Sequence, residues 1–554
     1  MLLQRLVEYS GRLDLPPSNY LKRVVHWFIE LDAKGNFRGM QATGDFKDRQ
    51  NLKHLNLPHV MRSVAVRSKL LSDNGEYVLG IGREGSKPER ISKQHESFVG
   101  TVRACAEATG NKGVKAVLNF LENLEIDSFP LPDGFEPSHE ITFKVAGRPP
   151  VEDSDVRDWW ASTFDDDSAE RMQCIICGRT RTPERRLQQK IKRIPGGQTA
   201  GNAIISANSP AFESYALHES LIAPTCSECA EKFSHAANDL LTKPESHIRV
   251  DPVVYIFWTK EDVGFDGLRL LSDPEPEDVK ALIRAVFTGA ESSIPEDYTP
   301  FYAAALTASG ARVAVRDWLD TTIGGVKRAL ARYFRLMDIV NPNGGEGKPL
   351  NLYQLSGATV RDLKDLPAHV PRGLIHFALT GGRLPNSLLF EAVRRNRAEQ
   401  GVTLPRAALI KMVMLSHGAL GLKEEDMVQL DATNTRPAYL CGRLFALLEK
   451  IQREALGSVG ASIVDRFYGS ASSAPASVFG NLMRGSQAHL SKLRKNEKKK
   501  GLHGYFQKQL EEIAAHLAEF PLKLTLQEQG LFALGYYFER PYRKTKGEEA
   551  GKEE

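Results

Sequence analysis

The sequence of 554 residues has few cysteines, little net charge and no long apolar run. Its six cysteines are too few for a disulfide framework in so long a chain, so we expect a reducing compartment. Because 73 basic residues nearly balance 69 acidic ones, any affinity for nucleic acid must come from local clusters of cations. No run of about 18 apolar residues is present, and charged residues interrupt the leucines of Met1–Leu15. We therefore expect a soluble, cytoplasmic protein without a membrane partner.

Motifs of common catalytic centres are also missing. There is no Gly-x-Ser-x-Gly nucleophile elbow, no His-Glu-x-x-His zinc motif and no set of kinase motifs. A zinc deaminase needs His-x-Glu, but His95, His139 and His218 are each followed directly by Glu. These absences favour a binding protein over an enzyme.

Four of the six cysteines form two Cys-x-x-Cys pairs, Cys174 with Cys177 and Cys226 with Cys229. Each pair offers two thiolates from one tight turn, and two such turns supply the four tetrahedral sulfur ligands that Zn²⁺ prefers. The spacing therefore predicts a structural zinc ion. Buried cysteines without a metal are the alternative.

A zinc-braced endonuclease of the HNH type is an alternative function, because it also places two Cys-x-x-Cys pairs around its active site. Such an enzyme needs at least two histidines there, as general base and as metal ligand. Only His218 lies between the pairs in this sequence. This alternative predicts metal-dependent cleavage that is lost in the variant His218→Ala.

Two clusters of cations predict contact with a phosphate backbone. The first cluster lies between the cysteine pairs and comprises Arg179, Arg181, Arg185, Arg186, Lys190, Lys192 and Arg193. The second lies near the end of an expected helix and comprises Lys492, Arg494, Lys495, Lys498, Lys499 and Lys500. A solvated charged face is the alternative for the first, and charge compensation at a helix C-terminus is the alternative for the second.

Two segments rich in small residues follow the first basic cluster. They are Pro195–Asn202 and Ile204–Tyr215. Because small residues let a ligand approach the backbone closely, main-chain N–H groups here can cradle nucleic acid. Gln198 and Asn208 are the candidate side chains in this segment. A tight structural loop is the alternative.

The whole pattern predicts an α+β protein of several domains, since single cores stop growing at roughly 250 to 300 residues. The expected order is a mixed α/β N-terminal domain that recognises DNA (1–150), a zinc-ribbon-like insert with the basic and Gly-rich segments (151–260), a mainly helical region (261–426) and a C-terminal antiparallel helical bundle (427–554).

Individual elements are also predicted by periodicity and turn residues. We expect a hairpin that begins with Val24–Leu31, strands at Tyr77–Ile81 and Val253–Trp258, helix over Phe98–Leu124, and a C-terminal helix that ends at Gly457.

Segments along nearly the whole chain resemble the large subunit of the subtype I-C CRISPR-associated Cascade complex, a Csd-type family. The resemblance is carried by Leu3–Tyr9, the Pro16-Pro17 turn with Tyr20, Val24–Gly35, Leu71–Asn74, Tyr77–Gly80, Gly197–Tyr215, Gly442–Lys450 and Phe467–Ser472. The zinc ion is not part of this resemblance and is predicted from cysteine spacing alone.

The resemblance implies a non-catalytic protein that sits at the 5′ end of a guide crRNA in the prokaryotic cytoplasm. It implies that the protein reads the protospacer-adjacent motif (PAM) in target double-stranded DNA, helps to open the duplex and recruits a separate helicase-nuclease for antiviral defence, together with the other Cascade subunits. A missing active site is then expected, because RNA-guided complexes leave sequence reading to base pairing. The resemblance further implies an internal translation start at Met427 that yields a small subunit.

Within such a protein we expect Lys69, Ser72 and Asn74 to enter a DNA groove at the motif. An Asn amide donates and accepts hydrogen bonds at base edges, and Lys69 can pair with a phosphate or a base acceptor. An ordinary hairpin turn at Asn74-Gly75 is the alternative.

Overall fold

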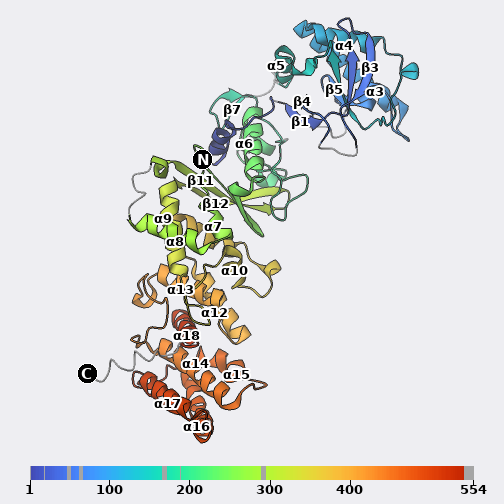
Figure 1. Cartoon of the computed structure of the whole chain (residues 1–554). Helices are drawn as coiled ribbons and strands as arrows, with labels where there is room; N and C mark the ends of the chain where they lie inside the picture. The colour runs from blue at the N-terminus through green and yellow to red at the C-terminus, as the bar shows by residue number, and fades with distance from the viewer. Residues whose placement is uncertain are drawn as a thin grey trace. The chain divides into compact units, whose positions relative to one another are not determined.

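The computed structural model describes residues 2–17, 19–46, 51–60, 66–164, 171–187, 189–288 and 295–541. The chain divides into two compact units (Figure 1). The first unit contains Met1–Ile191 and Ala203–Ala237, and the second contains Lys192–Asn202 and Asn238–Glu554. No described helix is both long enough and apolar enough to cross a lipid bilayer.

The first unit contains a four-stranded sheet in the order β3-β2-β6-β5. Its strands are β2 (Trp27–Leu31), β3 (Phe37–Ala42), β5 (Ser72–Asn74) and β6 (Glu140–Val145), and the pairing is antiparallel except between β2 and β6. The expected hairpin is confirmed as β2-β3. Its turn is held by the carboxylate of Asp32, which accepts hydrogen bonds from the backbone N–H groups of Lys34 and Asn36.

Helices α3 (Pro88–Thr109) and α4 (Lys112–Glu122) pack against this sheet (Figure 1). The helix expected over Phe98–Leu124 is present as two helices. The break is at Gly110, whose left-handed φ of 67° ends α3. Asn111 then caps α4 by accepting the N–H groups of its first turn. Phe98 of α3 is fully buried, so the core lies between these helices and the sheet.

The remaining elements of the first unit surround this core and the cysteine pairs. They are α1 (Leu2–Ser10), β1 (Tyr20–Val24), β4 (His54–Pro58), α2 (Gly75–Val78), α5 (Ser154–Ser162), β7 (Met172–Gln173), β8 (Thr180–Arg181) and α6 (Ser227–Leu240), whose last turn belongs to the second unit. Strands β1 and β4 pair as a separate antiparallel ribbon.

The prediction of a strand at Tyr77–Ile81 is wrong, because part of this segment is helical. Asn74 ends β5 and caps the short helix α2, because its side-chain oxygen accepts the backbone N–H of Tyr77 at 3.3 Å. The cap satisfies an N–H group at the start of the helix and outweighs the preference of Tyr and Val for strands.

The second unit begins with a four-stranded antiparallel sheet in the order β12-β11-β10-β9. Its strands are β9 (His247–Val250), β10 (Val253–Thr259), β11 (Pro300–Ser309) and β12 (Arg312–Thr322). The expected strand at Val253–Trp258 is confirmed as β10. The hairpin β11-β12 lies in the region expected to be mainly helical. Its Ala303, Ala304 and Ala305 favour helix by propensity, but they are buried in a central strand, where packing decides.

Helices form the rest of the second unit (Figure 1). They are α7 (Arg269–Ser272), α8 (Pro276–Thr288), α9 (Ile323–Met337), α10 (Leu352–Gly357), α11 (His369–Thr380), α12 (Asn386–Glu399), α13 (Leu404–Ser416), α14 (Pro437–Leu456), α15 (Ile463–Ala471), α16 (Phe479–Lys495), α17 (Lys500–Ala514) and α18 (Leu526–Glu539). As expected, the helix before Gly457 ends there, where Gly457 has a φ of 72°.

Helices α14 and α18 run parallel to each other and lie unusually close, since Tyr439 faces Gly535 and Arg443 faces Glu539 further along both helices. A Cβ atom on Gly442 would come within 2.1 Å of the carbonyl oxygen of Phe532, and one on Gly535 within 2.3 Å of that of Tyr439. These glycines therefore let the two backbones touch. The fully buried Glu539 accepts a hydrogen bond from Arg443 at 3.0 Å across the same interface.

Candidate metal centre and nucleic-acid interface

The first cysteine pair lies on a tight turn between β7 and β8. The N–H of Cys174 donates to the carbonyl of Arg179 at 2.9 Å, and the N–H of Gly178 donates back to the carbonyl of Cys174 at 2.9 Å. Gly178 has a φ of 71°, a conformation that glycine adopts without strain. These bonds close the turn that carries Cys174 and Cys177.

The second cysteine pair lies at the N-terminus of α6. Cys226 immediately precedes this helix, and Cys229 lies in its first turn. The N–H of Ile175 donates to the carbonyl of Pro224 at 2.9 Å and so ties the first turn to the residues before the second pair. One tight turn therefore faces one helix N-terminus, where the helix dipole favours thiolates.

The four cysteine sulfurs all lie within 4.8 Å of one another, and those of Cys177 and Cys226 are 4.0 Å apart. Zinc–sulfur bonds of about 2.3 Å in a tetrahedron place the sulfurs roughly 3.8 Å apart. The pKa of Cys226 falls to about 5, and that of Cys229 rises, because the two groups share a hydrogen bond in which Cys226 is the acceptor. The sulfurs fit a structural zinc ion with four protein ligands.

The first basic cluster is divided between the two units. Lys192 and Arg193 are exposed and belong to the second unit, as does the exposed Gln198. The rest of the cluster belongs to the first unit, as does the exposed Asn208, so the cluster is not one face of a single unit.

Within the first unit, part of this basic cluster is committed to internal bonds. Arg181 donates to Glu228 at 2.6 Å, and Arg186 pairs with Glu219 at 2.6 Å. Lys190 and Asn208 also have interaction partners. By contrast, the side chains of Arg179 and Arg185 are exposed and have no hydrogen-bond or ion-pair partner among the described residues. These two guanidinium groups are the ones open to a ligand.

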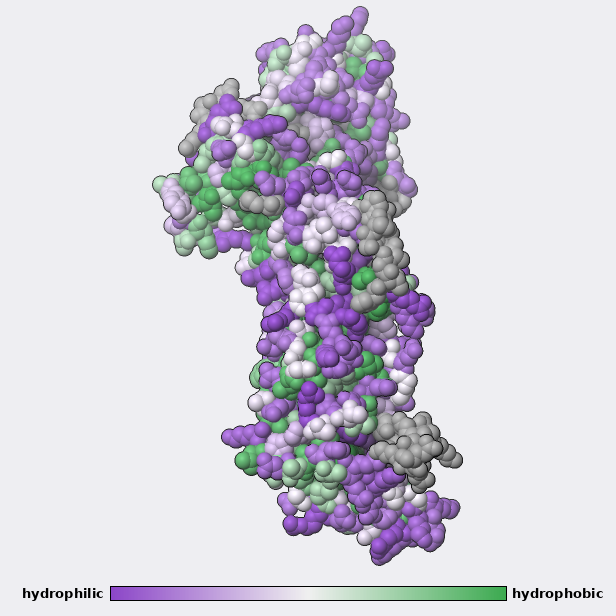
Figure 2. Space-filling model, turned by 90° about the vertical axis from the view of Figure 1, so that its left-hand side faces the viewer, coloured by the Kyte–Doolittle hydropathy of each residue, from purple (hydrophilic) through white to green (hydrophobic). Residues whose placement is uncertain are grey.

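The second basic cluster spans the end of α16, the following turn and the first residue of α17. Lys499 donates to the carbonyl of Glu454 at 2.7 Å and so fixes this turn. The cations that are exposed and have no ion-pair partner among the described residues are Lys492, Arg494, Lys495, Lys498 and Lys500. Hydrophilic residues gather at the lower end of the molecule in Figure 2, where these helices lie.

Charge compensation explains only part of this second cluster. Cations in the last turn of α16 suit the negative end of that helix dipole. Lys500, however, opens α17, where a positive charge meets the positive end of the dipole. Such a charge is unfavourable in the free protein and becomes favourable when an anion binds.

The three residues expected to contact DNA differ in their availability. Lys69 is only 5% exposed and donates to both oxygens of Glu140, at 2.7 and 2.8 Å. Ser72 is fully buried and donates to the same carboxylate at 2.8 Å. Lys69 and Ser72 therefore hold the loop against β6, and their side-chain donors are committed to Glu140.

Asn74 is half-buried, and only its side-chain oxygen is committed, as the cap of α2. Its amide nitrogen has no partner among the described residues and is left as a donor. The hairpin turn considered for Asn74-Gly75 is wrong, because these residues join a strand to a helix.

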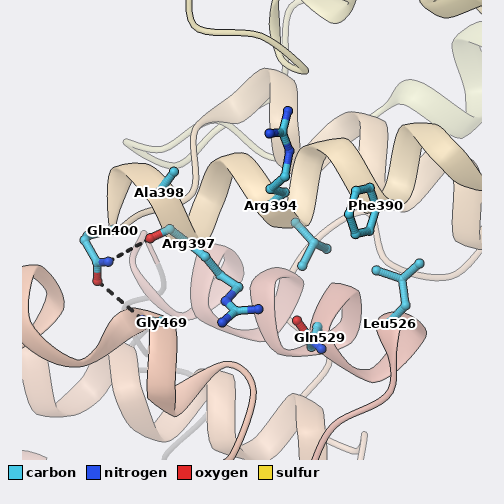
Figure 3. Close-up of a pocket in the computed structure, with 9 residues that line it drawn as sticks. Phe390, Arg394, Arg397, Ala398, Gln400, Gly469, Leu526 and Gln529 are labelled. Atoms are coloured by element: carbon cyan, nitrogen blue, oxygen red, sulfur yellow. Dashed lines mark hydrogen bonds between the residues drawn. The ribbon is translucent and has the colours of Figure 1, made fainter.

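A pocket of about 570 Å³ lies between α12, α15 and the first turn of α18 (Figure 3). Arg397 extends from α12 toward Gln529, whereas Arg394 extends away and pairs with Glu391 at 2.6 Å. Phe390, which is 52% exposed, lies at the edge of the pocket. The guanidinium of Arg397 has no ion-pair partner among the described residues, so this pocket contains an uncommitted cation.

The four cysteines form the one group of three or more potential metal ligands found among the described residues. His218, which the endonuclease alternative requires, is exposed and binds Glu213 at 2.9 Å. No feature of the described residues supports an HNH centre.

The chain belongs to the family of the CRISPR-associated protein Cas_Csd1, whose model matches residues 4–543. The CRISPR association implied by the sequence resemblance is therefore confirmed. No curated protein matches this chain.

We expect the purified protein to contain one zinc ion per chain, measured by elemental analysis. The variant Cys226→Ser should lose that ion because it removes one of four ligands. Removal of zinc should also lower the free energy of unfolding, by about 4 kcal/mol if the free zinc concentration was 1,000 times Kd.

The matched control is Cys105→Ala, which removes a buried cysteine outside the cluster. It should keep the zinc ion. Wild-type protein that contains no metal when purified without chelators, or a Cys226→Ser protein that retains a full equivalent, contradicts the assignment.

Proposed function

We propose that this chain is the large subunit of a type I-C RNA-guided Cascade complex and that it catalyses no reaction itself. It binds guide crRNA, target double-stranded DNA and the other subunits in the prokaryotic cytoplasm. It reads the protospacer-adjacent motif, helps to open the duplex and recruits a separate helicase-nuclease in antiviral defence. The observation that carries this proposal is the family match over nearly the whole chain.

The chemistry of the metal site supports a binding role. Four cysteine sulfurs within 4.8 Å of one another fill the coordination sphere of a zinc ion. A catalytic zinc keeps one position open for water or substrate, and this set leaves none. The proposed zinc ion therefore holds structure.

The exposed cations support contact with nucleic-acid backbone. In an RNA-guided complex base pairing reads the sequence, so the protein needs broad phosphate contact and only a few groups that read bases. The turn between α16 and α17 offers Lys495, Lys498 and Lys500 without internal ion-pair partners among the described residues. We assign backbone contact to this turn.

We assign recognition of the protospacer-adjacent motif to the loop that contains Asn74. The buried contacts of Lys69 and Ser72 with Glu140 make them positioning residues, because they fix β5 against β6. The uncommitted amide nitrogen of Asn74 is then the group that donates to a base edge. An amide that donates to a base acceptor favours a matching base over a mismatch by about 1 to 3 kcal/mol.

The variant Asn74→Asp tests this assignment in a reconstituted complex. The carboxylate keeps an oxygen to cap α2 but removes the amide donor, so the protein should remain as stable as wild type. We expect the preference among motif variants, measured by equilibrium binding to target duplexes, to fall by roughly 5- to 150-fold.

Asn74→Ala serves as the comparison, because it removes both the cap and the donor and should also cost about 1 kcal/mol of stability. An Asn74→Asp complex that ranks motif variants as wild type does would remove Asn74 from motif reading.

For the α16–α17 turn, we expect the triple variant Lys495→Gln, Lys498→Gln and Lys500→Gln to bind DNA with a weaker dependence on salt. Each lost phosphate contact lowers the slope of log K against log salt by roughly 0.7 to 0.9, so the triple variant should lower it by about 2 to 3. The measurement is DNA affinity over a salt series.

The matched control replaces Lys93, Lys112 and Lys115, which are exposed on α3 and α4 and also lack ion-pair partners among the described residues. It removes the same charge elsewhere and should leave the slope unchanged. Equal slopes for wild type and the α16–α17 variant, or equal losses in both triple variants, contradict a local contact.

We also propose that residues 427–554 are made separately as a small subunit from an internal start at Met427. The close packing of α14 on α18 lies within this fragment and supports a stable fold, and α18 also packs on α12 and α13, which precede the fragment. Met427 itself is 5% exposed and lies in the apolar core of the second unit, so it is not the ordinary surface methionine of the alternative interpretation.

N-terminal sequencing of the proteins that copurify with the complex should therefore find a fragment that begins at or near Met427. Replacing the Met427 codon with one for leucine should remove the fragment and leave the full-length chain. A wild-type preparation that contains no such fragment contradicts the idea.

A further inference from the structure

The loop from Phe212 to Leu221 presents one aromatic side chain almost entirely to solvent. The ring of Tyr215 is 95% exposed, and it has no hydrogen bond, ring contact or ion contact among the described residues. It lies in a two-residue turn closed by a hydrogen bond from the N–H of Leu217 to the carbonyl of Ser214 at 2.9 Å. Packing within this unit therefore does not account for a tyrosine at this position.

The backbone of the turn does not account for a tyrosine either. Tyr215 and Ala216 have φ angles of 54° and 59°, which is the arrangement of a type I′ turn. Asn and Gly are the usual residues in such turns, because a Cβ atom makes positive φ unfavourable. A bulky residue here costs on the order of 1 kcal/mol or more, and strain of this kind often marks a functional position.

The loop is nevertheless held firmly in place. The carboxylate of Glu213 accepts hydrogen bonds from the backbone N–H of Glu219 at 3.0 Å and pairs with His218 at 2.9 Å. The N–H of Ser220 donates to the carbonyl of Arg185 at 3.0 Å. These bonds fix the base of the turn, so the ring projects from a supported loop.

Cations lie directly beside this loop. Arg186 pairs with Glu219, and its side chain is still 85% exposed. Arg185, whose backbone binds the loop, has an exposed guanidinium without a partner among the described residues. Proteins that bind single-stranded nucleic acid combine exposed aromatic rings, which stack on bases, with cations that contact phosphate, and this loop offers both.

We propose that Tyr215, together with Arg185 at the base of its loop, is a binding site for an unpaired nucleotide of RNA or DNA. The base stacks on the ring of Tyr215, and Arg185 contacts a flanking phosphate. Paired bases in a duplex are already stacked on their neighbours, so the site selects single strands. This inference rests on the proposed function, because it requires that the chain binds nucleic acid.

Two variants separate stacking from turn structure in the full-length chain. Tyr215→Phe keeps the ring and should bind a fluorescent single strand of about 12 nucleotides within roughly twofold of wild type. Tyr215→Gly removes the ring and relieves the backbone strain, so it should be at least as stable as wild type. Its affinity for the strand should nevertheless fall roughly 5- to 150-fold, because one stacked base is lost.

Parallel titrations with an oligodeoxythymidine and an oligouridine of equal length identify the source of the strand. A loss confined to the DNA probe assigns the site to an opened target strand, and a loss confined to RNA assigns it to the guide. Losses for both probes assign it to either strand, and each of these three results supports the site. Tyr298→Ala, which removes another exposed tyrosine, should change neither affinity.

The inference is overturned if Tyr215→Gly binds both single strands as wild type does, or if it weakens a duplex probe as much as a single strand. It is also overturned if Tyr215→Phe loses as much affinity as Tyr215→Gly, because the hydroxyl would then be responsible. These outcomes leave the proposed function intact. Failure of wild-type protein to bind any nucleic acid, alone or with guide RNA and partner subunits, overturns both.

Discussion

The constraint on which the candidate interface depends is the convergence of four cysteine sulfurs from two distant pairs. Cys174 and Cys177 lie on a turn, whereas Cys226 and Cys229 lie at the start of a helix, yet all four sulfurs are within 4.8 Å of one another. The chain between the pairs contains little regular structure. Arg185 and the Tyr215 turn lie in this intervening segment, so a metal held by the sulfurs anchors both ends of the loop that presents them.

Local signals in the sequence predicted much of the fold. Turn residues placed the hairpin at Asp32, Gly457 marked a helix end, and apolar content placed the strand β10. Predictions failed where an interaction between distant residues, or a single cap, decided the structure. Tyr77 and Val78 favour a strand, but the cap at Asn74 makes them helical. The alanines of β11 favour helix, but β10 and β12 pair with β11 on both sides and the three side chains are buried.

The features of the candidate site also fall into two groups, those that the local sequence predicts and those that distant contacts decide. The convergence of the cysteines follows from the spacing of their pairs, and the cations of the α16–α17 turn are exposed as the charge pattern suggests. The burial of Lys69 was not predictable from its neighbours, because its partner Glu140 lies on a different strand. Similarly, Tyr215 lies in a turn with two positive φ angles, which the residue types at these two positions do not indicate.

We propose above that this chain binds nucleic acid within an RNA-guided complex and does not cut it. The direct measurement follows a labelled target duplex incubated with the purified chain, guide RNA, partner subunits and a divalent metal, without the helicase-nuclease. We predict a guide-dependent shift of the duplex with both strands at full length. Strands shortened by the chain alone, or a complete complex that forms equally well without this chain, would contradict it.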